Sequence, residues 1–304
     1  MTSPRIVSVF GATGLQGSAV VDALLKDGTF LPRAITRDPN SATSQKLKAR
    51  GAQVVRGDSL NKASLVKALE GSEAVFAVTV VNVPHVDGKD EVTQGRNMVD
   101  AAKEVGVKFF IWTGLPGMKR ITGGKLQNCT HFDDKEIVQE YLQSSGLAHA
   151  SLMLPAFLEN LWSYDILKKT PTGYTFSLPL SPSKKHQFAW IGRDVPAAAL
   201  ALLKNYTDAA KFEEINGKAY AVVNAKMSNA ELAEKMGRVL GVEVTYTQSP
   251  PMGIAEMDEM WEFVNEYEGY YATPIPNPDL LALGMKFSTV DEFVEVEVKA
   301  RYGQ

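Results

Sequence analysis

The sequence contains a single cysteine, Cys129, so no disulfide bond can form within the chain. Such low cysteine usage is typical of proteins that work in a reducing compartment. The sequence also lacks any apolar run of about 18 residues, the length that suggests a membrane-spanning helix. Residues 1–5 lead directly into an apolar segment, so no signal peptide is expected. These absences predict a cytoplasmic protein and leave the nucleus open.

Neither sign of charge is in large excess. Asp and Glu number 35, Lys and Arg number 32, and the net charge is −3. The broad basic surface with which proteins bind nucleic acids directly is therefore not expected. Hydrophobic residues make up 45% and charged residues 22% of the chain, which is ordinary for a globular protein. No metal site is expected.

Short apolar runs alternate with helical stretches through the first half of the chain. Strands are predicted at residues 6–10, 32–37, 53–56, 74–80, 108–113 and 149–154. Helices are predicted at residues 15–27, 42–50, 61–70, 91–105 and 131–145. The alternation predicts an α/β fold with right-handed βαβ units and a doubly wound parallel sheet. Ligands of such sheets bind outside the carboxyl ends of the strands.

The pattern changes after residue 155, where proline and aromatic residues become frequent. Helices are predicted at residues 193–204, 228–240 and 251–267, and strands at 174–178, 219–224 and 243–247. We expect residues 1–155 to form one domain. Residues 156–304 are expected to form a smaller mixed α/β substrate or lid region that is integrated with the first domain and returns pieces to its sheet.

A glycine-spaced turn directly follows the first predicted strand. It contains Gly11, Thr13, Gly14, Leu15, Gln16 and Gly17, and an amphipathic helix begins at once. In this context the glycines permit a tight turn, a close approach of pyrophosphate to the backbone and close packing of the helix on the sheet. Free N–H groups at the helix N-terminus then face the phosphates. The alternative is a purely structural strand-to-helix turn.

Arg37 ends the second predicted strand, 20 residues after Gly17. Sites that prefer NAD(H) usually carry Asp or Glu there, whereas a guanidinium binds the 2′-phosphate of NADP(H). Ser41, in the loop that follows, is a second candidate for contact with this phosphate. The sequence therefore favours NADP(H), although an arginine at a strand end can simply be solvated.

Three polar residues follow the third and fourth predicted strands. Asp58 can accept a hydrogen bond from the adenine amino group, with Ser59 beside it, or it can begin the turn before the next helix. Thr79 lies where the chain is expected to pass the adenosine ribose and the diphosphate.

Further candidates follow the later strands. The hydroxyl of Thr113 can donate a hydrogen bond at a strand end or have no role. His131 and Lys135 lie four residues apart and therefore share one helix face. A histidine titrates near neutrality and can act as a general acid, but it can also be a surface residue at a helix start. Phe157 and Asn160 are expected to close over the nicotinamide or to begin a plain loop-to-helix connection.

These segments together resemble the NmrA-like proteins, an atypical branch of the short-chain dehydrogenase/reductases, and most closely the HSCARG-type NADPH sensors. The resemblance covers most of residues 5–165. It is carried by Gly11–Gly17, Thr36–Pro39, Gly57–Asp58, Thr113–Leu126, His131–Leu142 and Leu154–Asn160. The glycine turn is shared by many reductases, whereas the joint occurrence of the His131 helix and the Phe157–Asn160 segment is much more specific.

The resemblance implies a Rossmann-type NADP(H)-binding domain over residues 1–155. It implies cofactor contacts from the glycine turn, Asp58, Lys135 and the Phe157–Asn160 segment, with Lys135 on the nicotinamide ribose. Thr113 lies where these enzymes hold a serine that orients the substrate carbonyl, and His131 replaces their catalytic tyrosine. Dimerisation and a regulatory protein partner are expectations from the resemblance.

Two functions follow. The first is a redox-responsive sensor or regulator that binds NADP(H) with weak or no turnover, which the missing tyrosine favours. The alternative is an NADPH-dependent reductase of a small apolar quinone, enone, imine or carbonyl substrate. Its pocket would be lined by Thr113, Phe157, Trp162, Trp261 and Tyr267, although such aromatic residues are equally typical of a core or a dimer interface.

Overall fold

The computed structural model describes residues 5–80, 90–267 and 269–303. Its main layer is a seven-stranded sheet in the order β11-β6-β5-β4-β1-β2-β3, with each strand parallel to its neighbours. The strands are β1 (Arg5–Val9), β2 (Phe30–Thr36), β3 (Gln53–Arg56), β4 (Ala74–Ala77), β5 (Phe109–Gly114), β6 (His149–Met153) and β11 (Lys218–Ala221). The predicted Rossmann-type doubly wound parallel sheet is therefore confirmed.

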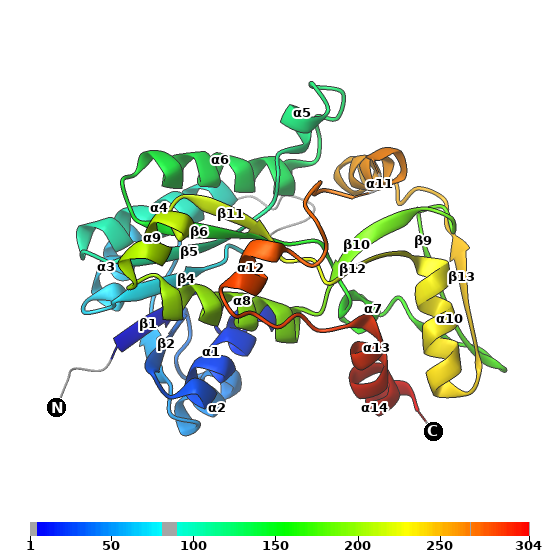
Figure 1. Ribbon diagram of the computed structural model, residues 1–304, viewed down its shortest axis with the longest axis horizontal. Helices are drawn as coiled ribbons and strands as arrows, with labels where there is room; N and C mark the ends of the chain where they lie inside the picture. The colour runs from blue at the N-terminus through cyan, green and yellow to red at the C-terminus, as the bar shows by residue number, and fades with distance from the viewer. Residues whose placement is uncertain (1–4, 81–89, 268, 304) are drawn as a thin grey trace.

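Helices cover both faces of this sheet (Figure 1). One face carries α1 (Leu15–Asp27), α2 (Ala42–Ala49), α8 (Ile191–Asn205) and α9 (Ala209–Ile215), and the other carries α3 (Lys62–Leu69), α4 (Glu91–Glu104) and α6 (Thr130–Ser144). Strand β5 illustrates the arrangement, because Phe109 and Ile111 pack in the first layer and Phe110 and Trp112 in the second. A strand buried on both faces reads as a continuous apolar run, which is why the pattern was visible in the sequence.

Most of the remaining elements build the region to the right in Figure 1. Two mixed three-stranded sheets have the orders β12-β10-β7 and β13-β9-β8. Their strands are β7 (Ala156–Phe157), β8 (Lys168–Lys169), β9 (Gly173–Leu178), β10 (Lys185–Ala189), β12 (Ala225–Ser228) and β13 (Glu243–Gln248). The helices are α5 (Met118–Ile121), α7 (Asn160–Ser163), α10 (Asn229–Leu240), α11 (Ala255–Tyr267), α12 (Pro278–Ala282), α13 (Val290–Phe293), the π-helical turn η1 (Val294–Val298) and α14 (Lys299–Tyr302). Of these, α5 and α12 lie nearer the middle of the view in Figure 1.

Several segments from the second half of the chain return to the main layer, among them β11 and α8. Strand β11 pairs with β6 at the edge of the sheet, and α8 packs against α1. The ring of Tyr206, at the end of α8, stacks on Phe109 with 4.7 Å between ring centroids. The two regions are therefore joined by shared layers as well as by the chain.

Three predicted boundaries were wrong. Strand β4 ends at Ala77 and not at residue 80, because the backbone of Val80 bonds to the side chain of Gln94 and not to a neighbouring strand. Helix α11 begins at Ala255 and not at residue 251, because Gly253 has a positive φ of 77° and the preceding residues include two prolines. The predicted strand 219–224 ends at Ala221, and a separate strand, β12, begins at Ala225.

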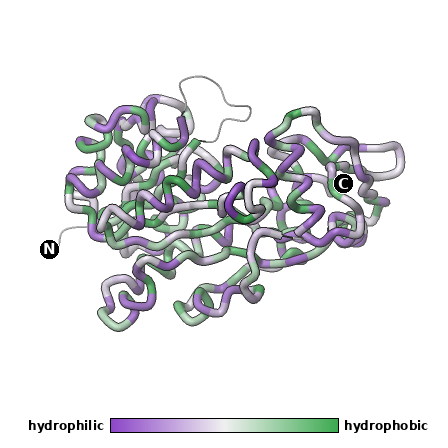
Figure 2. The backbone as a smooth tube through the Cα atoms, turned by 90° about the horizontal axis from the view of Figure 1, so that it is seen from above, coloured by the Kyte–Doolittle hydropathy of each residue, from purple (hydrophilic) through white to green (hydrophobic). Residues whose placement is uncertain are grey.

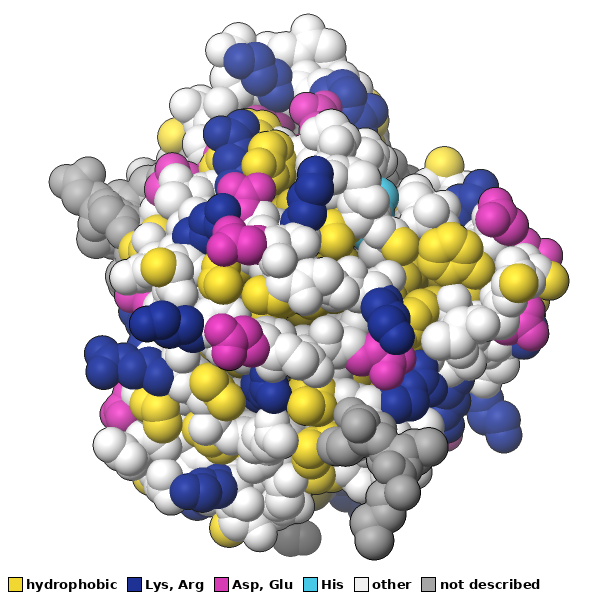
Figure 3. All heavy atoms as spheres, turned by 90° about the vertical axis from the view of Figure 1, so that its left-hand side faces the viewer, with side chains coloured by type: hydrophobic (Ala, Val, Ile, Leu, Met, Phe, Trp, Pro, Cys, Tyr) yellow, Lys and Arg dark blue, Asp and Glu magenta, His cyan; other side chains and the backbone are white. Residues whose placement is uncertain are grey.

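The face of the molecule seen in Figure 3 is mixed in charge and carries hydrophobic side chains between the charged ones. Lys and Arg side chains are interspersed with Asp and Glu over the face seen in Figure 3, and hydrophilic and hydrophobic residues alternate along the outer helices in Figure 2. None of the helices that the structure describes combines the length and the apolar composition needed to cross a membrane.

Candidate functional site

The turn between β1 and α1 is built on the close approach of its glycines. Gly11 has a positive φ of 61°, and its carbonyl accepts a hydrogen bond of 2.9 Å from the N–H of Gly14. A Cβ on Gly17 would lie 2.3 Å from the Gly11 oxygen, so only glycine lets α1 start this close to the turn. The local sequence therefore sets this turn, as predicted.

The N-terminus of α1 fits an anionic ligand. Its N-cap, Gly14, has no side chain to bond the first N–H groups, and its first turn carries no acidic residue. Thr13 and Leu15 are exposed beside these groups. The side-chain oxygen of Gln16 is buried without a hydrogen-bond partner, and as an acceptor it does not contribute to binding an anion. Unpaired N–H groups at the positive end of a helix are a common phosphate site.

Arg37 lies exposed directly after β2 and has no hydrogen-bond or ion-pair partner among the described residues. Ser41, in contrast, is engaged locally. It caps α2 by accepting a 3.2 Å hydrogen bond from the Ser44 N–H, and its hydroxyl donates to the Ser44 hydroxyl at 2.8 Å. The guanidinium is thus the free cation at this strand end, and contact of either residue with a 2′-phosphate stays a prediction.

Asp58 and Ser59 follow β3 in a well-bonded turn. A carboxylate oxygen of Asp58 accepts the Leu60 N–H at 3.0 Å, the turn role that was the alternative to contact with adenine. The Ser59 hydroxyl donates to the side chain of Gln94 at 3.3 Å, and the same Gln94 oxygen accepts the Val80 N–H at 3.1 Å. Gln94, on α4, therefore ties the segments after β3 and β4 together. Contact of Asp58 and Ser59 with adenine stays a prediction.

Thr79 and Lys135 meet in a buried ion-pair cluster with a residue that the sequence did not indicate. Lys135 Nζ lies 2.7 Å from Glu91 Oε1 and donates to Thr79 Oγ1 at 2.8 Å, and Thr79 donates to the same Glu91 oxygen at 2.5 Å. Lys135 is 6% and Glu91 3% exposed, and the ammonium lies 5.2 Å from the centre of the Trp112 ring. The carboxylate therefore compensates the buried lysine charge.

This cluster lies next to the glycine turn. A Cβ on Gly11 would come within 2.5 Å of Val78 Cγ1, and Val78 directly precedes Thr79. The contact occurs because β1 and β4 are neighbours in the sheet, at the point where the strand order reverses. The fold thus brings two groups of predicted residues together, the glycine turn and the Thr79–Lys135 pair.

His131 lies one helical turn before Lys135 and is held by Glu256 of α11. One oxygen of Glu256 lies 2.7 Å from His131 Nδ1, and it also accepts the His131 backbone N–H at 2.8 Å and the Thr130 hydroxyl at 2.7 Å. Burial alone would raise the pKa of Glu256, but the hydrogen bonds from His131 and Thr130 outweigh it and lower the pKa to about 2. Glu256 is therefore ionised at neutral pH.

Thr113 is buried at the end of β5. It is 2% exposed, and its hydroxyl donates a 3.1 Å hydrogen bond to the backbone carbonyl of Ala77 at the end of β4. The hydroxyl thus joins two neighbouring strands, which is the structural role that the sequence left open. Its part in orienting a substrate stays a prediction.

Phe157 and Asn160 flank a buried carboxylate that positions their segment. Phe157 pairs with Ala189 of β10, and Asn160 begins α7. Between them, Glu159 is 3% exposed and accepts the backbone N–H groups of Ile191 and Gly192 at 3.1 and 2.7 Å. Burial raises the pKa of Glu159. The carboxylate fastens this segment to the start of α8, and contact with a nicotinamide stays a prediction.

The aromatic residues proposed for the substrate pocket lie in different places. Trp162 stacks on Phe293 in the C-terminal core, Trp261 is partly buried on α11, and Tyr267 is 41% exposed and stacks on Phe263. A different aromatic residue reaches the end of β6. The hydroxyl of Tyr271 donates a 2.8 Å hydrogen bond to the carbonyl of Leu154.

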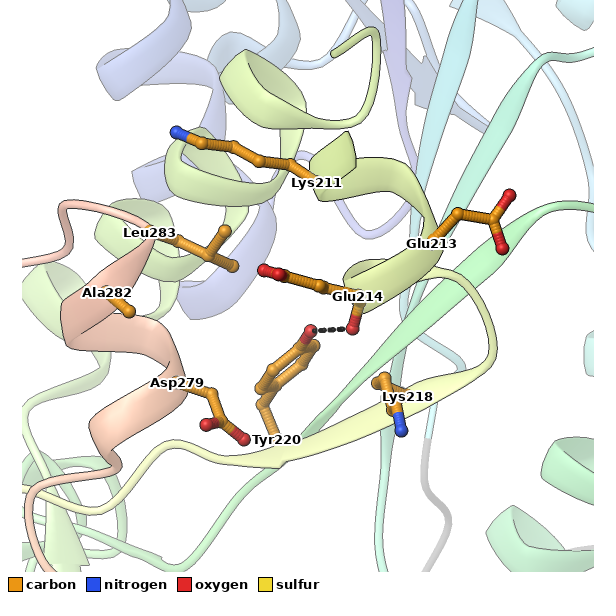
Figure 4. A pocket seen from close by; sticks show the side chains of 8 residues that line it. All are labelled: Lys211, Glu213, Glu214, Lys218, Tyr220, Asp279, Ala282 and Leu283. Carbon is orange, nitrogen blue, oxygen red and sulfur yellow. Dashed lines mark hydrogen bonds between the residues drawn. The ribbon is translucent and has the colours of Figure 1, made fainter. Parts of the chain in front are cut away.

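A separate cavity of about 410 Å³ lies at the edge strand β11, between α9 and α12 (Figure 4). It is lined by Lys211, Glu213, Glu214, Lys218, Tyr220, Asp279, Ala282 and Leu283. Tyr220 donates a 3.3 Å hydrogen bond to the backbone carbonyl of Glu214, and burial raises its pKa to about 12. Because the lining mixes lysines with carboxylates, it does not favour a ligand of one charge.

The relatives that sequence comparison finds include malD and FrzB, both named as NmrA-like family domain-containing oxidoreductases. MalD of Malbranchea aurantiaca is 32% identical over 195 residues, which cover 59% of this chain and only 57% of malD. FrzB of a Cladobotryum species is 28% identical over 313 residues, which cover 93% of this chain and 91% of FrzB.

A similar fold occurs in the crystal structure of NmrA, a negative transcriptional regulator, in complex with NADP. The TM-score is 0.84 with 17% sequence identity, and the match covers 99% of this chain and 97% of NmrA. At that identity the likeness shows the fold alone. The family assignment comes from the sequence itself, because the model of the NmrA-like family matches residues 3–294, and the chain therefore belongs to the NmrA-like family.

Proposed function

We propose that this protein binds NADP(H) at the carboxyl edge of its sheet and uses it to reduce a small apolar quinone, enone, imine or carbonyl compound. The observation that supports this best is the placement of two ionisable side chains, Lys135 and His131, one turn apart on α6. Lys135 bonds to Thr79, and the preceding residue, Val78, lies against Gly11 of the glycine turn. The names of malD and FrzB as oxidoreductases support the same class of activity.

The residues at this edge fit the parts of the cofactor. The backbone N–H groups of the glycine turn, including that of Gln16, would hold the diphosphate, and Arg37 the 2′-phosphate. Asp58 and Ser59 would face the adenine, and Thr79 would lie beside the adenosine ribose and the diphosphate. Lys135 would bind the nicotinamide ribose, and Phe157 and Asn160 would face the nicotinamide. When bound, NADPH supplies the hydride. NmrA, which has a similar fold, has been solved in complex with NADP, and this supports binding of such a cofactor.

A second candidate is a redox-responsive sensor or regulator with weak or no turnover. Two candidate catalytic groups support it, because both are buried and already bonded within the protein. The Thr113 hydroxyl bonds to the carbonyl of Ala77, and the Lys135 ammonium pairs with Glu91. The description of NmrA as a negative transcriptional regulator fits this function. Such a protein would respond to the cofactor only through a difference in affinity between two states.

Binding and turnover should be measured on the same sample. NADPH binding is followed by fluorescence, and NADPH oxidation by absorbance against quinones, enones, imines and aldehydes. We expect saturable NADPH binding and oxidation that depends on one substrate class. Binding without oxidation across the panel would overturn the reductase and favour the sensor, for which a change of mass with NADPH would be the next observation. Absence of NADPH binding would overturn both.

A further inference from the structure

Glu256 and His131 form a buried pair, and its geometry shows which nitrogen of the imidazole ring carries a proton. Glu256 is 7% and His131 8% exposed, and 2.7 Å separate Glu256 Oε1 from His131 Nδ1. An ionised carboxylate can only accept hydrogen bonds. Nδ1 must therefore carry a hydrogen, in the neutral ring as well as in the protonated ring.

The other ring nitrogen faces a different environment. His131 Nε2 has no hydrogen-bond partner among the described residues. The atom is not fully buried. It is thus open to a ligand or to solvent. With Nδ1 bonded to Glu256, Nε2 is the atom of the ring that can gain or lose a proton.

We propose that Glu256 is the positioning residue for His131, holding the ring and its Nδ1 proton so that Nε2 donates a proton to the bound substrate. The inference rests on the proposed reductase function. Reduction of a carbonyl group adds a hydride to carbon, which NADPH supplies, and a proton to oxygen. His131 gives the proton from Nε2 as the oxygen gains negative charge, and the neutral ring then recovers a proton from solvent. The carboxylate stabilises the protonated ring and is not itself protonated.

The fold keeps Glu256 in place through the docking of α11 onto the segment before α6. Glu259, one turn along α11, accepts the backbone N–H of Asn128 at 2.6 Å and its side-chain amide at 2.5 Å. Glu262 and Glu266 pair with Lys125 at 3.1 and 2.5 Å. Of these four glutamates, Glu256 is the one that bonds to a histidine, which makes Glu259 a matched control on the same helix.

The first test is the tautomer of His131, measured by ¹⁵N NMR of histidine-labelled protein, with His131→Asn used to assign the signal. In the wild-type protein above neutral pH we expect the hydrogen on Nδ1 and none on Nε2. A neutral ring that carries its hydrogen on Nε2 and none on Nδ1 would overturn the proposal. This measurement is made on the wild-type protein. It therefore requires neither substrate turnover nor a Glu256 variant that folds.

The second test compares Glu256→Gln with Glu259→Gln under steady-state conditions. We expect kcat to fall about 100-fold in Glu256→Gln, since general acid catalysis is lost in part, while NADPH affinity stays within about twofold. Glu259→Gln, which disturbs the docking of α11 but not the contact with His131, should lower kcat by less than about fivefold. Equal losses in both variants would assign the effect to docking of α11 and overturn the proposal. If the wild-type protein binds NADPH without oxidising it, the reductase function and proton donation fail together, whereas the tautomer still decides how Glu256 holds the ring.

Discussion

Arg37 sets the charge at the end of β2, because its guanidinium is exposed and no described residue neutralises it. Lys135, by contrast, is compensated by Glu91 before any ligand arrives. The two cations at this sheet edge therefore differ in how each can interact with a ligand. Arg37 is free to recognise a phosphate by its charge, whereas Lys135 is held in place and contributes a positioned N–H donor.

Arg37→Asp should reverse the preference between the two dinucleotides. A carboxylate repels the 2′-phosphate and removes a charge-assisted hydrogen bond, so we expect the Kd for NADPH to rise about 10- to 100-fold. The Kd for NADH should stay the same or fall. Lys48→Asp, on the exposed side of α2, makes the same change in net charge and should leave both values within about twofold. Unchanged NADPH affinity in Arg37→Asp would contradict the strand-end argument.

At the scale of elements, the two glycines at the start of α1, Gly14 and Gly17, have different structural roles. Gly17 lets the helix pack on the turn, since a Cβ there would overlap the Gly11 carbonyl. Gly14 has an extended conformation with φ −96° and ψ 178°, and a Cβ on it would meet its nearest atom at 3.4 Å. Gly17 thus stabilises the packing of the helix on the turn, and Gly14 leaves open the side that a ligand would approach.

The two glycines should respond differently to alanine. Gly17→Ala should destabilise the protein by about 1–3 kcal/mol through overpacking and weaken NADPH binding. Gly14→Ala should melt close to the wild-type temperature but bind NADPH at least about tenfold more weakly, because its methyl group covers the phosphate side. Thermal denaturation with and without NADPH measures both effects. A Gly14→Ala protein that binds NADPH like the wild type would mean that the phosphates lie elsewhere.

At the scale of the whole molecule, α8 connects the main layer to the C-terminal region. Asp194, in its first turn, is fully buried and accepts hydrogen bonds from the Trp190 N–H at 2.9 Å, the Ser288 N–H at 2.8 Å and the Asn224 side chain at 3.0 Å. Burial raises the pKa of Asp194. At its other end, Tyr206 packs on Phe109 of the central sheet. Loss of either end should therefore affect both regions.

Asp194→Ala should lower the free energy of unfolding by about 3 kcal/mol, because it leaves several buried donors without an acceptor. Urea denaturation followed by tryptophan fluorescence and by circular dichroism should show one common transition. Asp291→Ala serves as a control, because it removes a 2.6 Å ion pair between Lys235 and an aspartate that is 72% exposed. It should lower the free energy of unfolding by less than about 1 kcal/mol. Separate transitions for the two probes would show that the regions unfold independently.

The sequence by itself determined the doubly wound sheet, the glycine turn, the exposed Arg37 and the shared face of His131 and Lys135. All of these depend on neighbours a few residues apart, through strand and helix periodicity and the sterics of glycine. Only the tertiary structure decided the partners of the ionisable groups. Glu91 reaches Lys135, and Glu256 reaches His131 from 125 residues away, because packing of α4 and α11 on α6 brings them there. Such contacts leave no periodic signal, since burial and hydrogen bonding select them after the chain has folded.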